Sequence, residues 1–122
     1  MVVNEVKRRY DSLIRQQHAE GYWEDSAINS FKAMFADGVV ESEAVMNDLD
    51  KVDRMQMRKV YATLLALFIL EQNFEDFKKQ SELIVQKAKN YLKKQGVNDI
   101  LQKLDLLYDE LLLTDENITG NA

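Results

Sequence analysis

The chain has 122 residues, a formal net charge of −5, 46% hydrophobic and 30% charged residues, and neither cysteine nor proline. This length is enough for one domain with a single core, and the lack of cysteine excludes a disulfide framework and a thiolate metal site. The negative charge argues against nucleic acid or an anionic membrane as partner, because phosphate groups bind to positive surfaces.

Two helices are predicted at the start of the chain. Apolar residues recur at helical spacing over residues 4–19, with Asn4 as a suitable N-cap and Gly21 as the stop. A second helix is predicted from residue 25 or 26 to Ala36, with Ile28, Phe31, Ala33, Met34 and Phe35 on its apolar side. The start lacks the apolar stretch of a secretory signal, which predicts a cytoplasmic protein.

The following segment is acidic and irregular. Asp37 and Gly38 predict a turn, and Ser42 is expected to cap a short helix that ends near Leu49. The run from Asp48 to Asp53 is expected to form a loop or a junction between helices.

Residues 60–70 form an uncharged apolar run with polar residues on both sides. A membrane helix takes roughly 20 apolar residues, so this run is too short to cross a bilayer. A helix that is apolar all round is typical of one surrounded by other helices. We therefore predict a buried central helix over residues 54–73.

Two more helices are predicted after it, over residues 78–95 and 99–113. Gly96 is expected to end the first of these and Asn98 to cap the second. The last helix has an inward stripe, which further apolar residues are expected to broaden. The stripe is Ile100, Leu104, Leu107 and Leu111, and the added residues are Leu101, Tyr108 and Leu112.

These elements define an all-α fold, a compact bundle of five or six helices packed around the central helix. Residues 1–113 are expected to form a single helical domain. Residues 114–122 are polar and are expected to form a flexible C-terminal tail.

Gln17, Gly21 and Trp23 form the most specific local motif. A helix that ends in glutamine, followed after three residues by Gly-x-Trp, resembles the QW motif of α/α-toroid proteins such as triterpene cyclases. Glycine permits the tight turn, the indole packs beneath it, and the glutamine amide is expected to cap free N–H groups of the next helix. We interpret this corner as structural, without chemistry of its own.

Three stretches, at residues 13–24, 60–70 and 82–92, support a wider resemblance. They are similar to the C-terminal helical region of proteins that combine a vault inter-α-trypsin (VIT) domain with a von Willebrand factor A domain. This group includes the von Willebrand factor A domain-containing protein 5 type, and vault poly(ADP-ribose) polymerase is a relative. The resemblance implies a non-enzymatic protein–protein interaction module and association with vault-like particles, with major vault protein or another subunit of a large assembly as partner. Glu20 stands where the family commonly has aspartate, and the VIT and A domains are absent from this chain.

The residues for catalysis or metal binding are sparse. His18 is the only histidine, which excludes a multi-histidine metal site and most histidine-based triads. Residues 48–59 lack the glycine and the terminal glutamate of a calcium-binding EF-hand loop. We therefore expect no enzyme, no cofactor and no metal.

The candidate interface residues are charged or apolar. They comprise the acidic residues Glu41, Glu43, Asp48 and Asp50, the lysines Lys79, Lys89 and Lys93, and the apolar residues Leu112 and Leu113. Met55 and Met57 are expected to join Leu112 and Leu113 in a docking patch if all four are exposed. In an alternative interpretation, the chain is a small acidic inhibitor or immunity-type protein that masks a basic site of its partner through residues 41–53.

Overall fold

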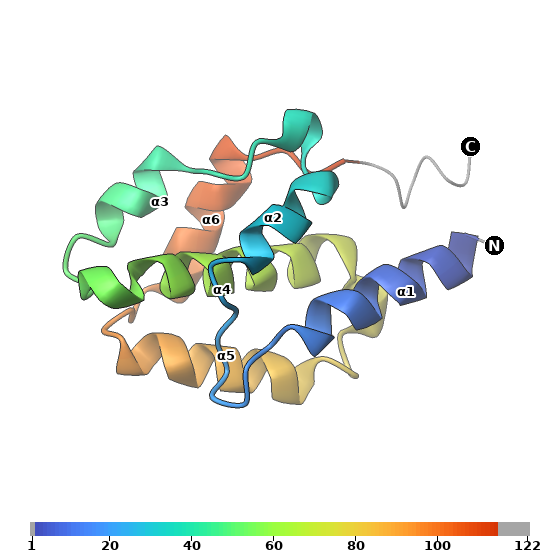
Figure 1. Ribbon diagram of the computed structural model, residues 1–122, viewed down its shortest axis with the longest axis horizontal. Coiled ribbons are helices and arrows are strands. Elements are labelled where there is room, and N and C mark those ends of the chain that lie inside the picture. The colour runs from blue at the N-terminus through green and yellow to red at the C-terminus, as the bar shows by residue number, and fades with distance from the viewer. Residues whose placement is uncertain (1, 115–122) are drawn as a thin grey trace.

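The computed structural model describes the backbone of residues 2–114 and the side chains of residues 5–114 (Figure 1). The predicted all-α class is confirmed, since helices are the regular elements of this range. The α-helices are α1 Val2–Arg15, α2 Ala27–Phe31, α3 Glu43–Asp48, α4 Arg54–Asn73, α5 Glu82–Lys94 and α6 Ile100–Glu110. Short 3-10 helices cover Lys32–Met34, Ala36–Gly38 and Glu75–Phe77. Among the described residues, no helix is both long and apolar enough to cross a membrane.

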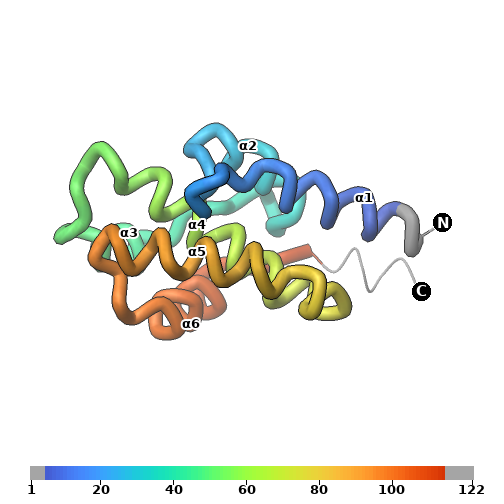
Figure 2. The backbone as a smooth tube through the Cα atoms, turned by 90° about the horizontal axis from the view of Figure 1, so that it is seen from below, coloured from blue at the N-terminus to red at the C-terminus, as the bar shows by residue number. Residues whose placement is uncertain are grey.

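Helix α4 lies at the centre of the bundle and has the predicted bounds. Every residue from Val60 to Leu70 is buried, and the Asp53 carboxylate accepts a hydrogen bond from the Met55 N–H at the start of the helix. Figure 1 shows α3 and α6 above α4 and α5 below it, while Figure 2 shows α1 and α2 on the opposite side from α6. A helix that is covered on all sides has no polar face, as its sequence predicts.

The first two helices are shorter than predicted. Helix α1 ends at Arg15, four residues early, because the chain turns back and pairs Gln17 with Trp23. Asn4 lies inside α1, so its predicted role as an N-cap is wrong. Helix α2 ends at Phe31 and is followed directly by the 3-10 helix Lys32–Met34. The helical run stops there, because Phe35 adopts an extended conformation and pairs with Leu113.

The last two helices also differ at their ends. Helix α5 begins at Glu82 instead of residue 78, after a turn that contains Ser81. Helix α6 is preceded by Asp99 at its N-cap position, so the predicted cap at Asn98 is wrong. Beyond Glu110 the chain is extended, and Thr114 donates from its N–H to the Met34 carbonyl. The rest of the predicted tail, residues 115–122, lies outside the described residues.

Gly96 ends α5 as predicted. Its φ is +90°, its N–H bonds to the Lys93 carbonyl, and the Val97 N–H bonds to the Leu92 carbonyl. This pair of hydrogen bonds defines a Schellman motif. The motif favours glycine at this position, because the backbone there has a left-handed conformation that glycine adopts without steric cost.

The buried apolar side chains form one cluster, but the predicted core of the last helix is partly wrong. Leu101, Tyr108 and Leu112 are exposed instead of broadening the inward stripe, and Ala33 is exposed as well. The inward face of α6 includes Lys103, whose Nζ lies 3.5 Å from an Asp48 oxygen and 3.2 Å from an Asp99 oxygen. A buried ammonium group is stable there because both carboxylates pair with it.

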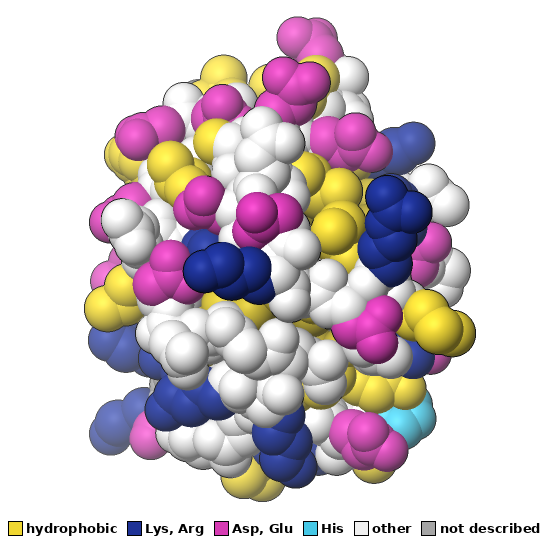
Figure 3. Space-filling view, turned by 90° about the vertical axis from the view of Figure 1, so that its left-hand side faces the viewer, with side chains coloured by type: hydrophobic (Ala, Val, Ile, Leu, Met, Phe, Trp, Pro, Cys, Tyr) yellow, Lys and Arg dark blue, Asp and Glu magenta, His cyan; other side chains and the backbone are white. Residues whose placement is uncertain are grey.

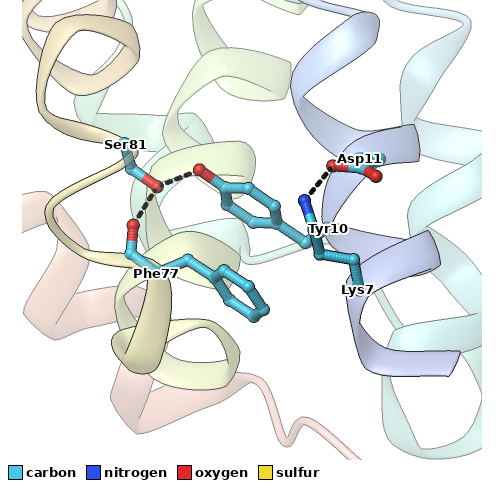
Figure 4. Close-up of polar contacts among 5 residues, drawn as sticks. All are labelled: Lys7, Tyr10, Asp11, Phe77 and Ser81. Carbon is cyan, nitrogen blue, oxygen red and sulfur yellow. Dashed lines mark hydrogen bonds and ion pairs between the residues drawn. The ribbon is translucent and has the colours of Figure 1, made fainter. Parts of the chain in front are cut away.

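The start of α5 is attached to α1 by an aromatic and polar contact (Figure 4). The Tyr10 ring stacks on Phe77 with 4.4 Å between the centroids, and its hydroxyl lies 2.7 Å from Ser81 Oγ. Ser81 Oγ in turn donates to the Phe77 carbonyl. The Lys7 ammonium lies 6.0 Å from both ring centroids and pairs with Asp11.

Candidate functional site

The corner at Gln17, Gly21 and Trp23 joins three helices. Trp23 is fully buried, and its indole N–H donates to the Leu13 carbonyl of α1 at 2.9 Å. Its backbone N–H donates to Thr63 Oγ1 of α4 at 3.0 Å. The predicted turn and the predicted burial of the indole are therefore present in the structure.

The Gln17 amide acts in the opposite sense to the predicted one. Its Nε2 donates to the carbonyls of Gly21 at 3.0 Å and Ile84 at 2.9 Å. Within the described part of the chain, the amide therefore binds acceptors and caps no N–H groups. Gly21 has φ +107°, and a Cβ at this position would lie 2.2 Å from the Lys87 carbonyl oxygen. The corner therefore packs directly against the backbone of α5.

His18 lies at the surface beside this corner. Its ring stacks on Tyr22 with 4.4 Å between centroids, and its Nδ1 accepts a hydrogen bond from the Glu20 N–H. The Lys59 ammonium lies 4.6 Å from the centroid of the Tyr22 ring. Burial raises the pKa of Tyr91, which packs against Tyr22, to about 12. These contacts hold the turn in place.

The acidic candidates surround α3. Glu41, Glu43, Asp48 and Asp50 are all exposed, and of these Asp48 pairs with the buried Lys103. Within residues 5–114, no three histidine or acidic side chains converge in a way that could hold a metal ion. The acidic side chains gather on the upper half of the face shown in Figure 3.

The basic candidates lie on α5 or just before it. Lys79 and Lys93 are exposed, and Lys89 is half-buried. Figure 1 places α5 on the opposite side of α4 from α3. The acidic and the basic candidates therefore belong to different surfaces and not to one interface.

The apolar candidates do not form the predicted patch. Met55 and Leu112 are highly exposed, whereas Met57 and Leu113 are half-buried. In Figure 1 the start of α4 lies far from the segment that follows α6. The Leu112 carbonyl accepts a hydrogen bond from the Ala36 N–H, so this segment packs against the region after α2.

The structure exposes a different apolar surface, on α6. Leu101 is 71% exposed and Tyr108 64% exposed. They are seven residues apart, which places them on the same side of the helix, with Asp105 between them. We call Leu101, Gln102, Asp105, Tyr108 and Asp109 the α6 outer face.

This face points away from α3. Lys103 and Glu110, also seven residues apart, both contact the α3 region: Lys103 pairs with Asp48, and Glu110 accepts hydrogen bonds from Ser42 Oγ and the Ala44 N–H. Leu101 and Tyr108 each precede these residues by two positions, which corresponds to about 200° around a helix. The seven-residue spacing of Leu101 and Tyr108, outside the inward stripe, was the sequence signal for this surface.

No family model, characterised protein or solved structure matches this chain. Among the surfaces described above, the α6 outer face is the one that combines large exposed apolar side chains with aligned charges.

Proposed function

We propose that the chain is a non-enzymatic protein–protein interaction module that binds its partner through the α6 outer face. The observation that carries this proposal is the alignment of Leu101 and Tyr108, both more than half exposed, on one side of a helix. Tyrosine is enriched at protein interfaces, because its ring is apolar and its hydroxyl remains able to bond. Covering these two side chains would remove apolar surface from water, which favours association.

We also propose that the chain is the C-terminal helical region of a VIT/von Willebrand factor A protein. Support comes from the contacts among the three stretches that resemble this family. Gln17 bonds to the Ile84 carbonyl, and Trp23 bonds to Thr63, so the first stretch touches both of the others. On this proposal the partner is a subunit of a vault-like particle, with major vault protein as the first candidate, and the location is the cytoplasm.

Sedimentation tests the vault proposal directly. The tagged full chain, in lysate of cells that contain vaults, is expected to sediment with very large particles. A chain that sediments entirely at monomer size would contradict vault association, while leaving the interaction module itself to the next test.

The interaction surface is tested by a double variant, Leu101→Ser with Tyr108→Ser. Both side chains are exposed, so we expect the helix content in circular dichroism to remain unchanged, and recovery of co-purified partners to fall at least about tenfold. The matched control is Met55→Ser, since Met55 is 84% exposed on α4. Equal recovery with the double variant and with the control would exclude the α6 outer face as the interface.

The exposed acidic residues around α3 favour a second candidate function, that of an inhibitor or immunity-type protein which masks a basic site. Asp48 pairs with the buried Lys103, so the test leaves it unchanged. Replacing Glu41, Glu43 and Asp50 by lysine should then abolish binding, since the approach to a basic site would become repulsive. The α6 double variant should bind normally if this alternative holds. Binding that survives the three lysines contradicts it.

A further inference from the structure

The charged side chains of the α6 outer face are all of one sign. They are Asp105 and Asp109, both exposed, whereas Asp99 pairs with Lys103 and Glu110 bonds to the α3 region. Lys103, the basic residue of α6, is 4% exposed and pairs with Asp48 and Asp99. A partner that covers Leu101 and Tyr108 therefore meets carboxylates at the edge of the contact.

We propose that the occupant of the α6 outer face is a basic amphipathic helix of a protein partner. This inference rests on the proposed function and specifies the chemistry of the partner. Its apolar side chains would cover Leu101 and Tyr108, and its lysine or arginine side chains would pair with Asp105 and Asp109. Seven residues of helix rise about 10 Å, which matches two turns of a packed partner helix with anchors at the same spacing.

Other occupants fit this surface less well. A second copy that used its own α6 would bring Asp105 and Asp109 close to the same carboxylates, and like charges at an interface are repulsive. The lysine-rich face of α5 from a second copy has the right charge. Its large exposed apolar side chain is Leu83, so it would offer one anchor for two positions. Nucleic acid and anionic lipid carry the same charge as the face itself.

Two synthetic peptides of equal length test the inference. Both are designed as amphipathic helices with leucine on one face; the first carries lysine on the other face and the second carries glutamate. Each is added to the ¹⁵N-labelled full chain, and the amide resonances are followed by NMR. The lysine peptide should shift the resonances of Leu101, Asp105 and Tyr108, and the glutamate peptide should leave them unchanged.

Variants of the chain separate apolar from charged contributions. Tyr108→Ser with Leu101→Ser should weaken the lysine peptide at least about tenfold. Asp105→Asn with Asp109→Asn should weaken it about threefold and reduce its dependence on salt, because exposed charge pairs are screened. Met55→Ser, the control, should bind like the unaltered chain.

Three results would overturn the inference. The first is that none of the α6 variants changes the affinity for the lysine peptide. The second is that the lysine peptide shifts only the amide resonances of residues 41–50. The third is a concentration-dependent shift of α5 and α6 resonances without peptide, which would identify a second copy as the occupant. The lysine peptide could fail to bind while recovery of the partner still depends on Leu101 and Tyr108. That result would contradict the inference that the partner is a basic helix, and the proposed function would stand.

Discussion

Gly21 is a single position on which the packing of the corner depends. A Cβ would lie 2.2 Å from the Lys87 carbonyl oxygen, and φ is +107°. Backbone atoms of α5 cannot rotate away, so Gly21→Ala must displace the corner. We expect a loss of about 3 kcal/mol or more in the free energy of unfolding, measured by urea denaturation.

Gly38→Ala is the matched control for this substitution. The backbone of Gly38 also has a left-handed conformation, with φ +68°, but a Cβ there would meet no atom of the described residues within 4 Å. Only the backbone strain remains, which costs about 1 kcal/mol. If both variants lost the same stability, the close approach to Lys87 would have no energetic role.

The sequence predicts some features of the corner at Gln17, Gly21 and Trp23 and not others. The tight turn at Gly21 and the burial of Trp23 follow from local residue chemistry. The direction of the Gln17 amide does not, because one of its acceptors is the Ile84 carbonyl, 67 residues further along the chain. An amide can donate or accept, and only the neighbouring helix decides between the two.

The burial of helix α4 leads to a prediction for the stability of the whole fold. Leu65 is fully buried near the middle of this helix, so Leu65→Asp places a carboxylate in the core without a partner. We expect a loss of more than about 4 kcal/mol and a chain that is unfolded by circular dichroism.

Met55→Asp is the control on the same helix. Met55 is 84% exposed in the first turn of α4, where a negative charge suits the helix dipole. We expect its stability to stay within about 0.5 kcal/mol of the unaltered chain. A folded Leu65→Asp chain would contradict the central position of α4.

Helix boundaries show why some elements were predicted well and others were not. The bounds of α4 depend on its own hydropathy and on the adjacent Asp53, so the sequence contains them. The helical run of α2 and the 3-10 helix Lys32–Met34 ends at Phe35, which pairs with Leu113 at the other end of the chain. The candidate surface was missed for a related reason: Leu101 and Tyr108 are apolar, and a periodic pattern alone assigns apolar residues to the core.

In the molecule as a whole, acidic and basic side chains belong to different helices around the central helix α4. Acidic residues predominate on α3 and α6, and lysines predominate on α5. On the face shown in Figure 3, most of the acidic side chains lie in the upper half. Such a distribution orients an approaching charged partner before contact, which raises the rate of association more than the affinity.

Two buried tyrosines give a prediction for the stability of the whole molecule at alkaline pH. The Tyr61 hydroxyl accepts a hydrogen bond from the Ser42 N–H and donates to the Val40 carbonyl. Burial, with smaller effects from Glu41 and Glu110, raises the pKa of Tyr61 far above its ordinary value, and burial raises that of Tyr91 to about 12. The folded chain therefore holds these two protons at a pH where the unfolded chain releases them.

The sign of the pH dependence follows from this difference. Since unfolding releases protons above pH about 10, the stability that these tyrosines contribute is complete below that pH and falls as the pH rises towards 12.

Tyr61→Phe should be less stable than the unaltered chain at pH 8, because it loses two hydrogen bonds. Between pH 8 and 11, however, urea denaturation should show a decline in its stability that is smaller by about 1.4 kcal/mol. Tyr108→Phe, altered at a 64% exposed position, should keep the original pH dependence. An identical decline in Tyr61→Phe and in the unaltered chain would show that ionisation of Tyr61 is not linked to unfolding.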